Sequence, residues 1–294
     1  MSDITLFRTR RIHTRGATIH CAMAGEGPPL LMLHGYPQTH SMWHRVAPEL
    51  ARHHTVVCPD LRGYGDSSKT KGLPDHSNYS KRALAQDMVE VMETLGHTRF
   101  DLVGHDRGGR VAHRLARDHG ARVGTLTVID ICPTLAMYAR TDMAFARAYY
   151  HWFLFIQPAP LPEKMVAGVG LDGIFGRMSA ATGGSQRAFA PAALQEYRRC
   201  FTAPMIHASC EDYRASAGID LEHDRADATT KLAMPVLAIW GTRGVVGKMF
   251  DALAEWRAVA HDVTGVALDS GHFVPEERPV EVAAAIRAFL ARPG

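Results

Sequence analysis

The chain has 294 residues, of which 46% are hydrophobic and 21% charged, a composition that excludes collagen, coiled coils and disordered chains. Its formal net charge is +3, and no run of lysine or arginine marks a nucleic-acid-binding surface. The N-terminus is charged where a signal peptide needs an apolar segment, and no stretch approaches 18 apolar residues, so we expect neither export nor a membrane span. The five cysteines are widely spaced and lack a C-x-x-C pair, so we expect neither a disulfide framework nor a zinc site. We therefore predict a cytoplasmic location.

Short apolar runs alternate with helical patterns along the chain. Period-two alternation at 3–13 and 17–24 predicts an antiparallel hairpin at the edge of a sheet. The apolar runs predict buried, mostly parallel strands at 30–33, 55–58, 100–103, 126–131, 236–240 and 263–268. Helices are predicted at 42–52, 79–96, 107–119, 247–260 and 278–291. This alternation predicts an α/β fold, with a mostly parallel sheet flanked by helices.

The strand rhythm stops between Ile131 and Lys231. That stretch is rich in methionine and aromatic residues and has a glycine-rich break at 168–173. We therefore predict a helical cap at 132–231, inserted after the sixth strand, and a core domain formed by 1–131 and 232–294.

A strand, a tight turn and the start of a helix are predicted around Gly104-His105-Asp106-Arg107-Gly108. This segment fits the nucleophile-elbow pattern G-x-nucleophile-x-G, in which glycines leave room for a sharp turn. Aspartate, not serine, stands at the nucleophile position. The alternative is that Asp106 only caps the helix that follows.

Two further segments favour catalysis. Residues 34–37, His-Gly-Tyr-Pro, follow a predicted buried strand, and backbone N–H groups there and at Arg107 can form an oxyanion hole. His272 directly follows the last predicted strand, at the end where ligands bind in open α/β sheets. The chain has 17 histidines, so His272 is distinguished by its position and not by its residue type.

A catalytic histidine of this kind needs an acid that orients it. In such folds the acid often follows the strand before the last one, but residues 240–247 contain no carboxylate. Asp130, at the end of the strand at 126–131, is the available substitute. The alternative is an aspartate that only forms a turn before Pro133. Asp106, His272 and Asp130 are our predicted catalytic residues.

An aspartate nucleophile implies a particular chemistry. A carboxylate with a pKa of about 4 is already ionised at neutral pH, so Asp106 needs no base to attack. Displacement at an alkyl carbon forms an ester, which suits halides and epoxides. His272 is then free to activate the water that hydrolyses this ester, with the developing charge held near Arg107 and Tyr36.

The sequence resembles a known protein family over essentially its whole length. The chain resembles the α/β-hydrolases of the dehalogenase and epoxide-hydrolase branch, and most closely the fluoroacetate (haloacetate) dehalogenases. The elbow with arginine directly after aspartate is the most discriminating motif. The segments that carry the resemblance are 34–39, 60–67, 104–108, 149–152, 210–213 and 271–272.

The resemblance assigns Arg107 and Arg110 to binding the substrate carboxylate. Both lie in the first predicted turn of a helix, where the helix dipole disfavours cations, so a compensating negative group is expected. The alternative is ion pairing with nearby acids, Asp106 included. Next to a nucleophile, two guanidinium groups can instead fix a carboxylate by charge-assisted hydrogen bonds.

The resemblance also implies a halide pocket formed by His151, Trp152 and Tyr213. From spacing alone these residues fit the core of amphipathic helices equally well. Fluoride leaves carbon poorly, so the site has to donate hydrogen bonds to the departing anion.

The leading hypothesis is a hydrolase, without cofactor or metal, that converts a haloacetate and water into glycolate and halide through an aspartyl ester. Its expected partner is a small anionic halocarboxylate, and homodimers are common in the family. An epoxide hydrolase is the first alternative, kept open by Tyr149, Tyr150 and Tyr213. A catalytically silent ligand-binding protein is the second alternative.

Overall fold

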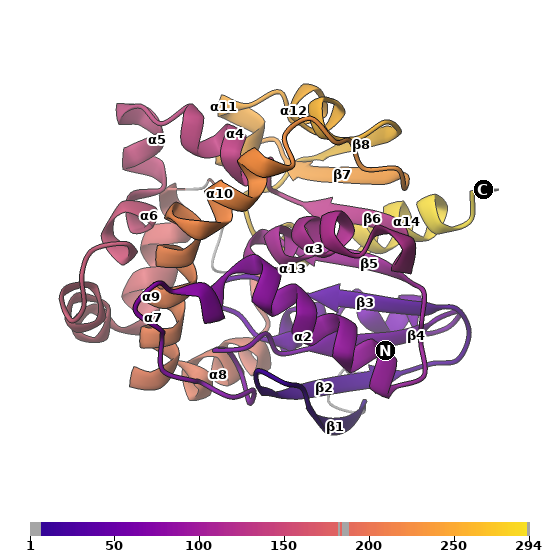
Figure 1. The fold of residues 1–294 in the computed structure, drawn as a ribbon, viewed down its shortest axis with the longest axis horizontal. Helices are drawn as coiled ribbons and strands as arrows, with labels where there is room; N and C mark the ends of the chain where they lie inside the picture. Colours follow the sequence, from indigo (N-terminus) through magenta and orange to yellow (C-terminus); the bar gives the residue numbers. More distant parts are fainter. Residues whose placement is uncertain (1–6, 182, 184–187, 293–294) are drawn as a thin grey trace.

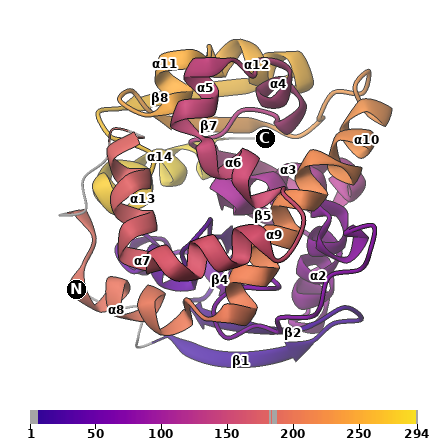
Figure 2. The same cartoon turned by 90° about the vertical axis from the view of Figure 1, so that its left-hand side faces the viewer.

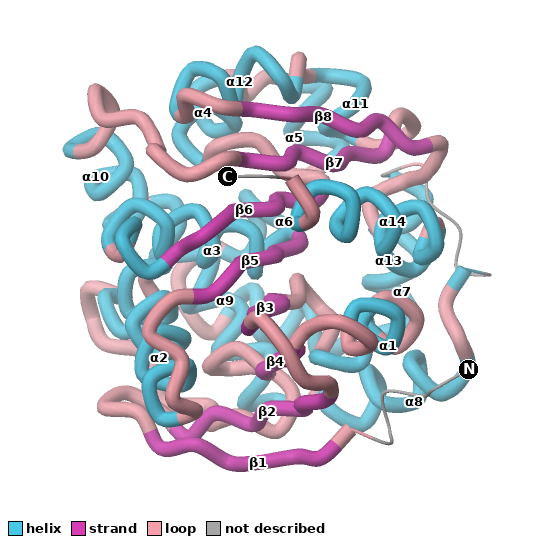
Figure 3. The backbone as a smooth tube through the Cα atoms, turned by 90° about the vertical axis from the view of Figure 1, so that its right-hand side faces the viewer, coloured by secondary structure: helices cyan, strands magenta, loops and turns pink. Residues whose placement is uncertain are grey.

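A sheet of eight strands forms the centre of the computed structural model, which describes residues 7–181, 183 and 188–292. β1 and β2 form an antiparallel hairpin at one edge, and β3 to β8 run parallel in the order β4-β3-β5-β6-β7-β8 (Figure 3). The strands are β1 (Arg8–His13), β2 (Thr18–Ala24), β3 (Pro29–Leu33), β4 (Thr55–Pro59), β5 (Phe100–His105), β6 (Val123–Ile129), β7 (Val236–Gly241) and β8 (Val263–Leu268).

Helices cover both faces of this sheet and bury its inner strands, as expected for parallel sheets (Figure 3). The prediction of a buried strand at 263–268 was wrong, because β8 lies at the edge of the sheet and none of its residues is buried. One face carries α2 (Lys81–Thr94), α3 (Asp106–Asp118) and α12 (Ala252–Val259), and the other carries α1 (Ala47–Leu50) and α14 (Pro279–Leu290). Two short helices, α11 (Val245–Met249) and α13 (Val274–Glu277), lie in the loops after β7 and β8.

The chain between β6 and β7 forms a group of helices at one end of the sheet (Figure 1). Seen from that end, α6, α7 and α9 lie in front of the strands (Figure 2). These helices are α4 (Thr134–Ala139), α5 (Met143–Ala148), α6 (Tyr150–Phe155), α7 (Leu161–Ala181), α8 (Pro191–Cys200), α9 (Ala203–Ala217) and α10 (Ile219–Ala226). The predicted fold class is thus confirmed, whereas the exact cap boundaries, 132–231, stay a prediction.

The predicted strands agree with the observed ones to within a few residues, while several helix predictions were wrong in detail. The helix expected at 42–52 is a 3-10 helix, His40–Trp43, followed by α1, because Pro48 lacks an N–H and starts a new helix. The helix expected at 247–260 is divided between α11 and α12, because Asp251 caps α12 by accepting a hydrogen bond from Ala254 N at 3.0 Å.

Two other segments singled out in the sequence are the glycine-rich break and the start of the first hairpin. The glycine-rich break at 168–173 is a kink inside α7, where Gly170 has a φ of 71°. Part of the first hairpin segment, residues 3–6, lies outside the described residues. Within the described part of the chain, no helix is both long and apolar enough to cross a membrane.

The turn from β5 into α3 packs so closely that only glycine fits around it. A Cβ atom on Gly104 would lie 2.5 Å from Gly108 O, and one on Gly108 would lie 2.3 Å from His34 O. Asp106 stands at the top of this turn with a φ of 48°, a left-handed conformation that costs free energy for a non-glycine residue. The surrounding contacts therefore hold Asp106 in a conformation it would not adopt alone.

We expect Gly108→Ala to lower the free energy of unfolding by about 1–3 kcal/mol, because its methyl group overlaps the backbone of the loop after β3. Gly168→Ala, in α7, is the matched control, because no atom lies within 4 Å of its added Cβ and alanine favours a helix by about 0.5–1 kcal/mol. Chemical denaturation of both variants tests this. Equal stabilities for Gly108→Ala and the wild type would contradict the close packing of the elbow.

Candidate active site

Asp106 lies at the carboxyl end of β5, where the strand-turn-helix expected from the sequence is observed. Its side chain is buried. Asp106 Oδ2 accepts a hydrogen bond from the backbone N–H of Tyr36 at 3.0 Å. One carboxylate oxygen is thus fixed by the loop after β3, which leaves Oδ1 as the oxygen without this restraint.

His272 and Asp130 lie next to that oxygen. His272 Nε2 lies 3.8 Å from Asp106 Oδ1, and His272 Nδ1 lies 2.6 Å from Asp130 Oδ2. Asp130 follows β6 directly, and its Oδ1 accepts a hydrogen bond from Gly241 N at the end of β7, at 2.9 Å. The structure therefore brings together the three residues that the sequence singled out for catalysis.

The charges at this site favour an ionised nucleophile beside a basic histidine. Burial alone would raise the pKa of Asp106, but neighbouring positive groups, His272 first among them, hold this pKa below its ordinary value. Burial alone would lower the pKa of His272, but the hydrogen bond to Asp130 and the charge of Asp106 raise it above its ordinary value. Burial raises the pKa of Asp130 in spite of its bond to His272.

Arg107 and Arg110 are both buried beside Asp106. Arg107 donates from Nε to Asp212 Oδ2 at 2.7 Å, and Arg110 donates from Nη1 to Thr134 Oγ1 at 2.9 Å. Among the described residues, Arg107 Nη1 and Arg110 Nε have no hydrogen-bond partner. The ion-pair alternative thus holds for Arg107, with Asp212 as its partner, yet a buried donor without an acceptor indicates an anion site.

An aromatic cluster from α6, α9 and the loop after β3 packs against these arginines. The Arg107 guanidinium lies 4.0 Å above the Tyr213 ring, and that of Arg110 lies 4.6 Å from the Trp152 ring. The rings of Tyr36 and His151 lie 5.9 and 5.7 Å from the Tyr213 ring. The predicted binding residues are therefore side by side, although they come from distant parts of the sequence.

Three buried polar atoms of this cluster lack a hydrogen-bond partner among the described residues, namely Tyr36 Oη, Tyr213 Oη and His151 Nδ1. Burial lowers the pKa of His151 to about 3, so its imidazole is neutral and carries one N–H. Unpaired hydroxyl and imidazole groups beside two cations suit a small anion.

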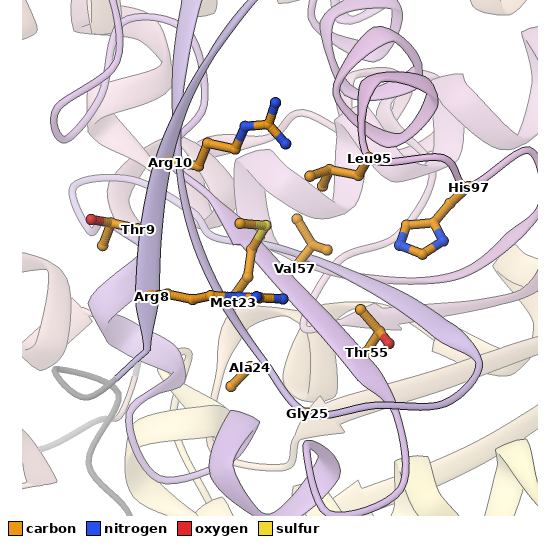
Figure 4. A pocket seen from close by; sticks show the side chains of 10 residues that line it. All are labelled: Arg8, Thr9, Arg10, Met23, Ala24, Gly25, Thr55, Val57, Leu95 and His97. Carbon is orange, nitrogen blue, oxygen red and sulfur yellow. The ribbon is translucent and has the colours of Figure 1, made fainter.

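A separate cavity of about 320 Å³ lies near the β1–β2 edge of the sheet, lined by Arg8, Arg10 and His97 among others (Figure 4). Its wall includes Thr55 at the start of β4, so it lies away from the carboxyl ends of the parallel strands. Ligands of open α/β sheets bind at those ends, where Asp106 lies.

Comparisons with known proteins agree with this geometry. The family model for the alpha/beta hydrolase fold matches residues 28–170. A fluoroacetate dehalogenase of Burkholderia sp. is 45% identical over 290 residues, which span 97% of this chain and 94% of that protein. The chain belongs to the α/β-hydrolase family. It is also 34% identical to a soluble epoxide hydrolase of Corynebacterium sp. (strain C12), over 94% of both chains. An α/β hydrolase structure from Nostoc sp. PCC 7120 superimposes with a TM-score of 0.96 at 53% identity, covering 99% of this chain and 100% of that one.

Sequence reasoning missed the residues that hold the two arginines. Asp212 lies in the segment 210–213 that carries the family resemblance, next to Tyr213 in α9, but no sequence pattern indicates that it pairs with Arg107. Thr134 follows Pro133, which reads as a turn and not as a partner for Arg110. These contacts depend on how α4 and α9 pack on α3, which no local pattern encodes.

We expect Asp130→Asn to lower the pKa of His272, because the variant removes the negative charge and the charge-assisted hydrogen bond that raise it. NMR titration of the His272 ring protons measures this pKa directly. Asp101→Asn, which alters an acid bonded to Thr125 Oγ1 near the opposite strand ends, is the control. An unchanged His272 pKa in Asp130→Asn would contradict the assigned pair.

Proposed function

We propose that the chain is a hydrolytic dehalogenase that converts a haloacetate, fluoroacetate above all, and water into glycolate and halide through a covalent ester on Asp106. The observation that best supports this proposal is the carboxylate–histidine–carboxylate arrangement beside two buried arginines, each with a nitrogen that has no partner in the described part of the chain. The likeness to the Burkholderia fluoroacetate dehalogenase supports the substrate class.

In the first step, Asp106 Oδ1 attacks the carbon that bears the halogen, and the carbon–halogen bond breaks with its electron pair going to the halide. Tyr36 N–H holds the other carboxylate oxygen and thereby fixes the direction of attack. The free nitrogens of Arg107 and Arg110 bind the substrate carboxylate, so that binding also aligns the reacting carbon.

In the second step, neutral His272 takes a proton from water through Nε2, and the resulting hydroxide adds to the ester carbonyl of Asp106. The charge that develops on the carbonyl oxygen is stabilised by the N–H of Tyr36, which already contacts this oxygen. The ester bond then breaks, and His272 returns the proton to the leaving glycolate oxygen. Asp106 keeps the oxygen of the added hydroxide, loses its remaining proton to solvent and is regenerated as a carboxylate. Asp130 stabilises the histidine while it carries the proton.

The departing halide is bound by the cap in this proposal. His151 and Trp152 on α6 and Tyr213 on α9 offer N–H and O–H donors next to the arginines. Hydrogen bonds to a charged acceptor contribute roughly 1.5–3 kcal/mol each, so three of them lower the barrier for fluoride departure substantially.

An epoxide hydrolase remains the alternative, because two buried tyrosine hydroxyls, those of Tyr36 and Tyr213, have no acceptor among the described residues and can protonate an epoxide oxygen. Of the other tyrosines considered, Tyr149 is stacked on Trp152 and Tyr150 is only half-buried. A neutral epoxide would leave two buried cationic donors unpaired, which favours the carboxylate substrate.

Halide release from fluoro-, chloro- and bromoacetate, together with hydrolysis of one epoxide, tests the function. We expect turnover of haloacetates by the wild type, none by Asp106→Asn, and a trapped ester in His272→Asn that mass spectrometry detects as added mass on Asp106. In a single turnover in ¹⁸O-labelled water, the label should enter Asp106 and not glycolate. Label in glycolate alone, or epoxide turnover that Arg107→Ala does not affect, would overturn the assignment.

The pH dependence of the two steps should differ. Because the pKa of Asp106 is lowered and that of His272 is raised, acidification protonates His272 while Asp106 is still ionised. Alkylation then continues while hydrolysis stalls, so rapid-quench experiments at pH 5 should show one halide per enzyme followed by slow turnover. At pH 8 this burst should disappear, and its persistence would argue against His272 as the base.

Homodimer formation and a cytoplasmic location stay predictions. We propose that a second copy binds at the exposed apolar face of α7, where Leu161, Met165 and Val169 are about half exposed and spaced four residues apart.

A further inference from the structure

Behind Arg107 lies a buried cluster of charges that the catalytic steps do not use. Lys81, at the start of α2, and Asp212 and Asp220, on α9 and α10, join Arg107 in this cluster, and all four side chains are at most 4% exposed. Lys81 Nζ contacts Asp212 Oδ1 closely and lies 3.4 Å from Asp220 Oδ2. Charges are seldom buried without a role, because desolvation costs several kcal/mol for each ion.

Asp212 is the centre of this cluster. Its Oδ1 is bound by Lys81, and its Oδ2 accepts hydrogen bonds from Arg107 Nε at 2.7 Å and Tyr64 Oη at 3.0 Å. Its backbone oxygen accepts a further bond from Arg107 Nη2 at 2.9 Å, and this nitrogen also reaches Ser216 Oγ at 2.5 Å. The Arg107 guanidinium is thus held along two of its three nitrogens, which leaves Nη1 as the free one.

The charges of the cluster cancel, because two cations face two carboxylates. Arg110 differs, since its contacts are to the neutral groups Thr134 Oγ1 and Met137 Sδ, at 2.9 and 3.2 Å. Burial and then the charge of Arg107 lower the pKa of Arg110, whereas Asp212 raises the pKa of Arg107 in spite of burial. Among the described residues, Arg110 therefore has no hydrogen bond to a carboxylate, although the charge of Asp106 acts on it. Arg107, in contrast, is held in a fixed orientation by Asp212.

We propose that Asp212, anchored by Lys81, is a positioning residue that orients Arg107 so that only its Nη1 faces the substrate carboxylate. This inference rests on the proposed function and deepens it, because it assigns carboxylate selection to a side chain that touches no substrate atom. Without Asp212 the Arg107 guanidinium would keep its charge but would no longer be held in one orientation. A misplacement of about 1 Å of such a substrate-binding group lowers the reaction rate on the order of 100-fold.

The test compares Asp212→Asn with the wild type in two measurements: kinetics with chloroacetate, and binding of acetate by calorimetry. We expect the KM for chloroacetate and the Kd of acetate to rise about tenfold or more, with kcat changed less, because ground-state binding is lost. Acetamide, which has no charge to orient, should bind equally to both proteins.

Asp87→Asn is the matched control, because Asp87 forms a buried pair with Arg62 of the same kind, with two N–O distances of 2.8 Å, away from the site. It should leave KM and the Kd of acetate unchanged. A shift in Asp212→Asn no larger than that in Asp87→Asn, or a loss confined to kcat, would overturn the proposal.

A double-mutant cycle shows whether Asp212 acts through Arg107. In an Arg107→Met background, Asp212→Asn should not weaken acetate binding further, and an undiminished second effect refutes the mechanism. If circular dichroism shows that Asp212→Asn is unfolded, Ser216→Ala decides instead. It removes one of the two contacts of Arg107 Nη2, together with a hydrogen bond of 3.2 Å to Asp220 Oδ2. We expect it to raise the Kd of acetate by about threefold, and an unchanged Kd overturns the proposal. Since acetate binding needs no turnover, absence of halide release from the wild type would refute the proposed function separately.

Discussion

The tight turn between β5 and α3 is the constraint on which the site depends. It places Asp106 at the sheet's carboxyl edge in a left-handed conformation, within reach of Tyr36 N–H on one side and His272 on the other. The strain is offset by dense packing around Gly104 and Gly108, where no side chain fits. Because α3 starts at Asp106, the same turn also sets where Arg107 and Arg110 lie on the helix, so nucleophile and anion-binding groups are positioned together.

In the proposed mechanism, the buried charges give the nucleophile and the base separate roles in the two steps. Asp106 remains ionised because positive groups surround it, and His272 is a stronger base than an ordinary histidine because Asp130 holds its other nitrogen. The cap residues are neutral donors, His151 among them, so the positive charge that an anionic substrate meets comes from the arginines of α3. A carboxylate and a departing halide can thus be bound at the same time in adjacent places.

The sheet, its edge hairpin and the elbow could be predicted because each follows from a local sequence pattern. These patterns are the alternation of apolar and polar residues, the apolar runs and the spacing of glycines. His272 and Asp130 could be found because parallel strand ends meet, so residues far apart in sequence converge there. The split helices around Pro48 and Asp251 were not, since capping competes with periodicity at these points. The contacts of Asp212, Lys81 and Thr134 could not be predicted, because they form only when α2, α4 and α9 pack on α3.

The carboxylate of Asp130 spans two strands, bonding both His272 and the N–H of Gly241. Asp130 therefore follows β6 and is also held by a hydrogen bond from the end of β7, so the proposed mechanism uses no acid from the loop 242–247. That loop can diverge in evolution, changing length or composition, without rebuilding the reaction centre. For the proposed reaction, an acid after either strand could bond the same histidine nitrogen, because the carboxyl ends of β6 and β7 meet at His272.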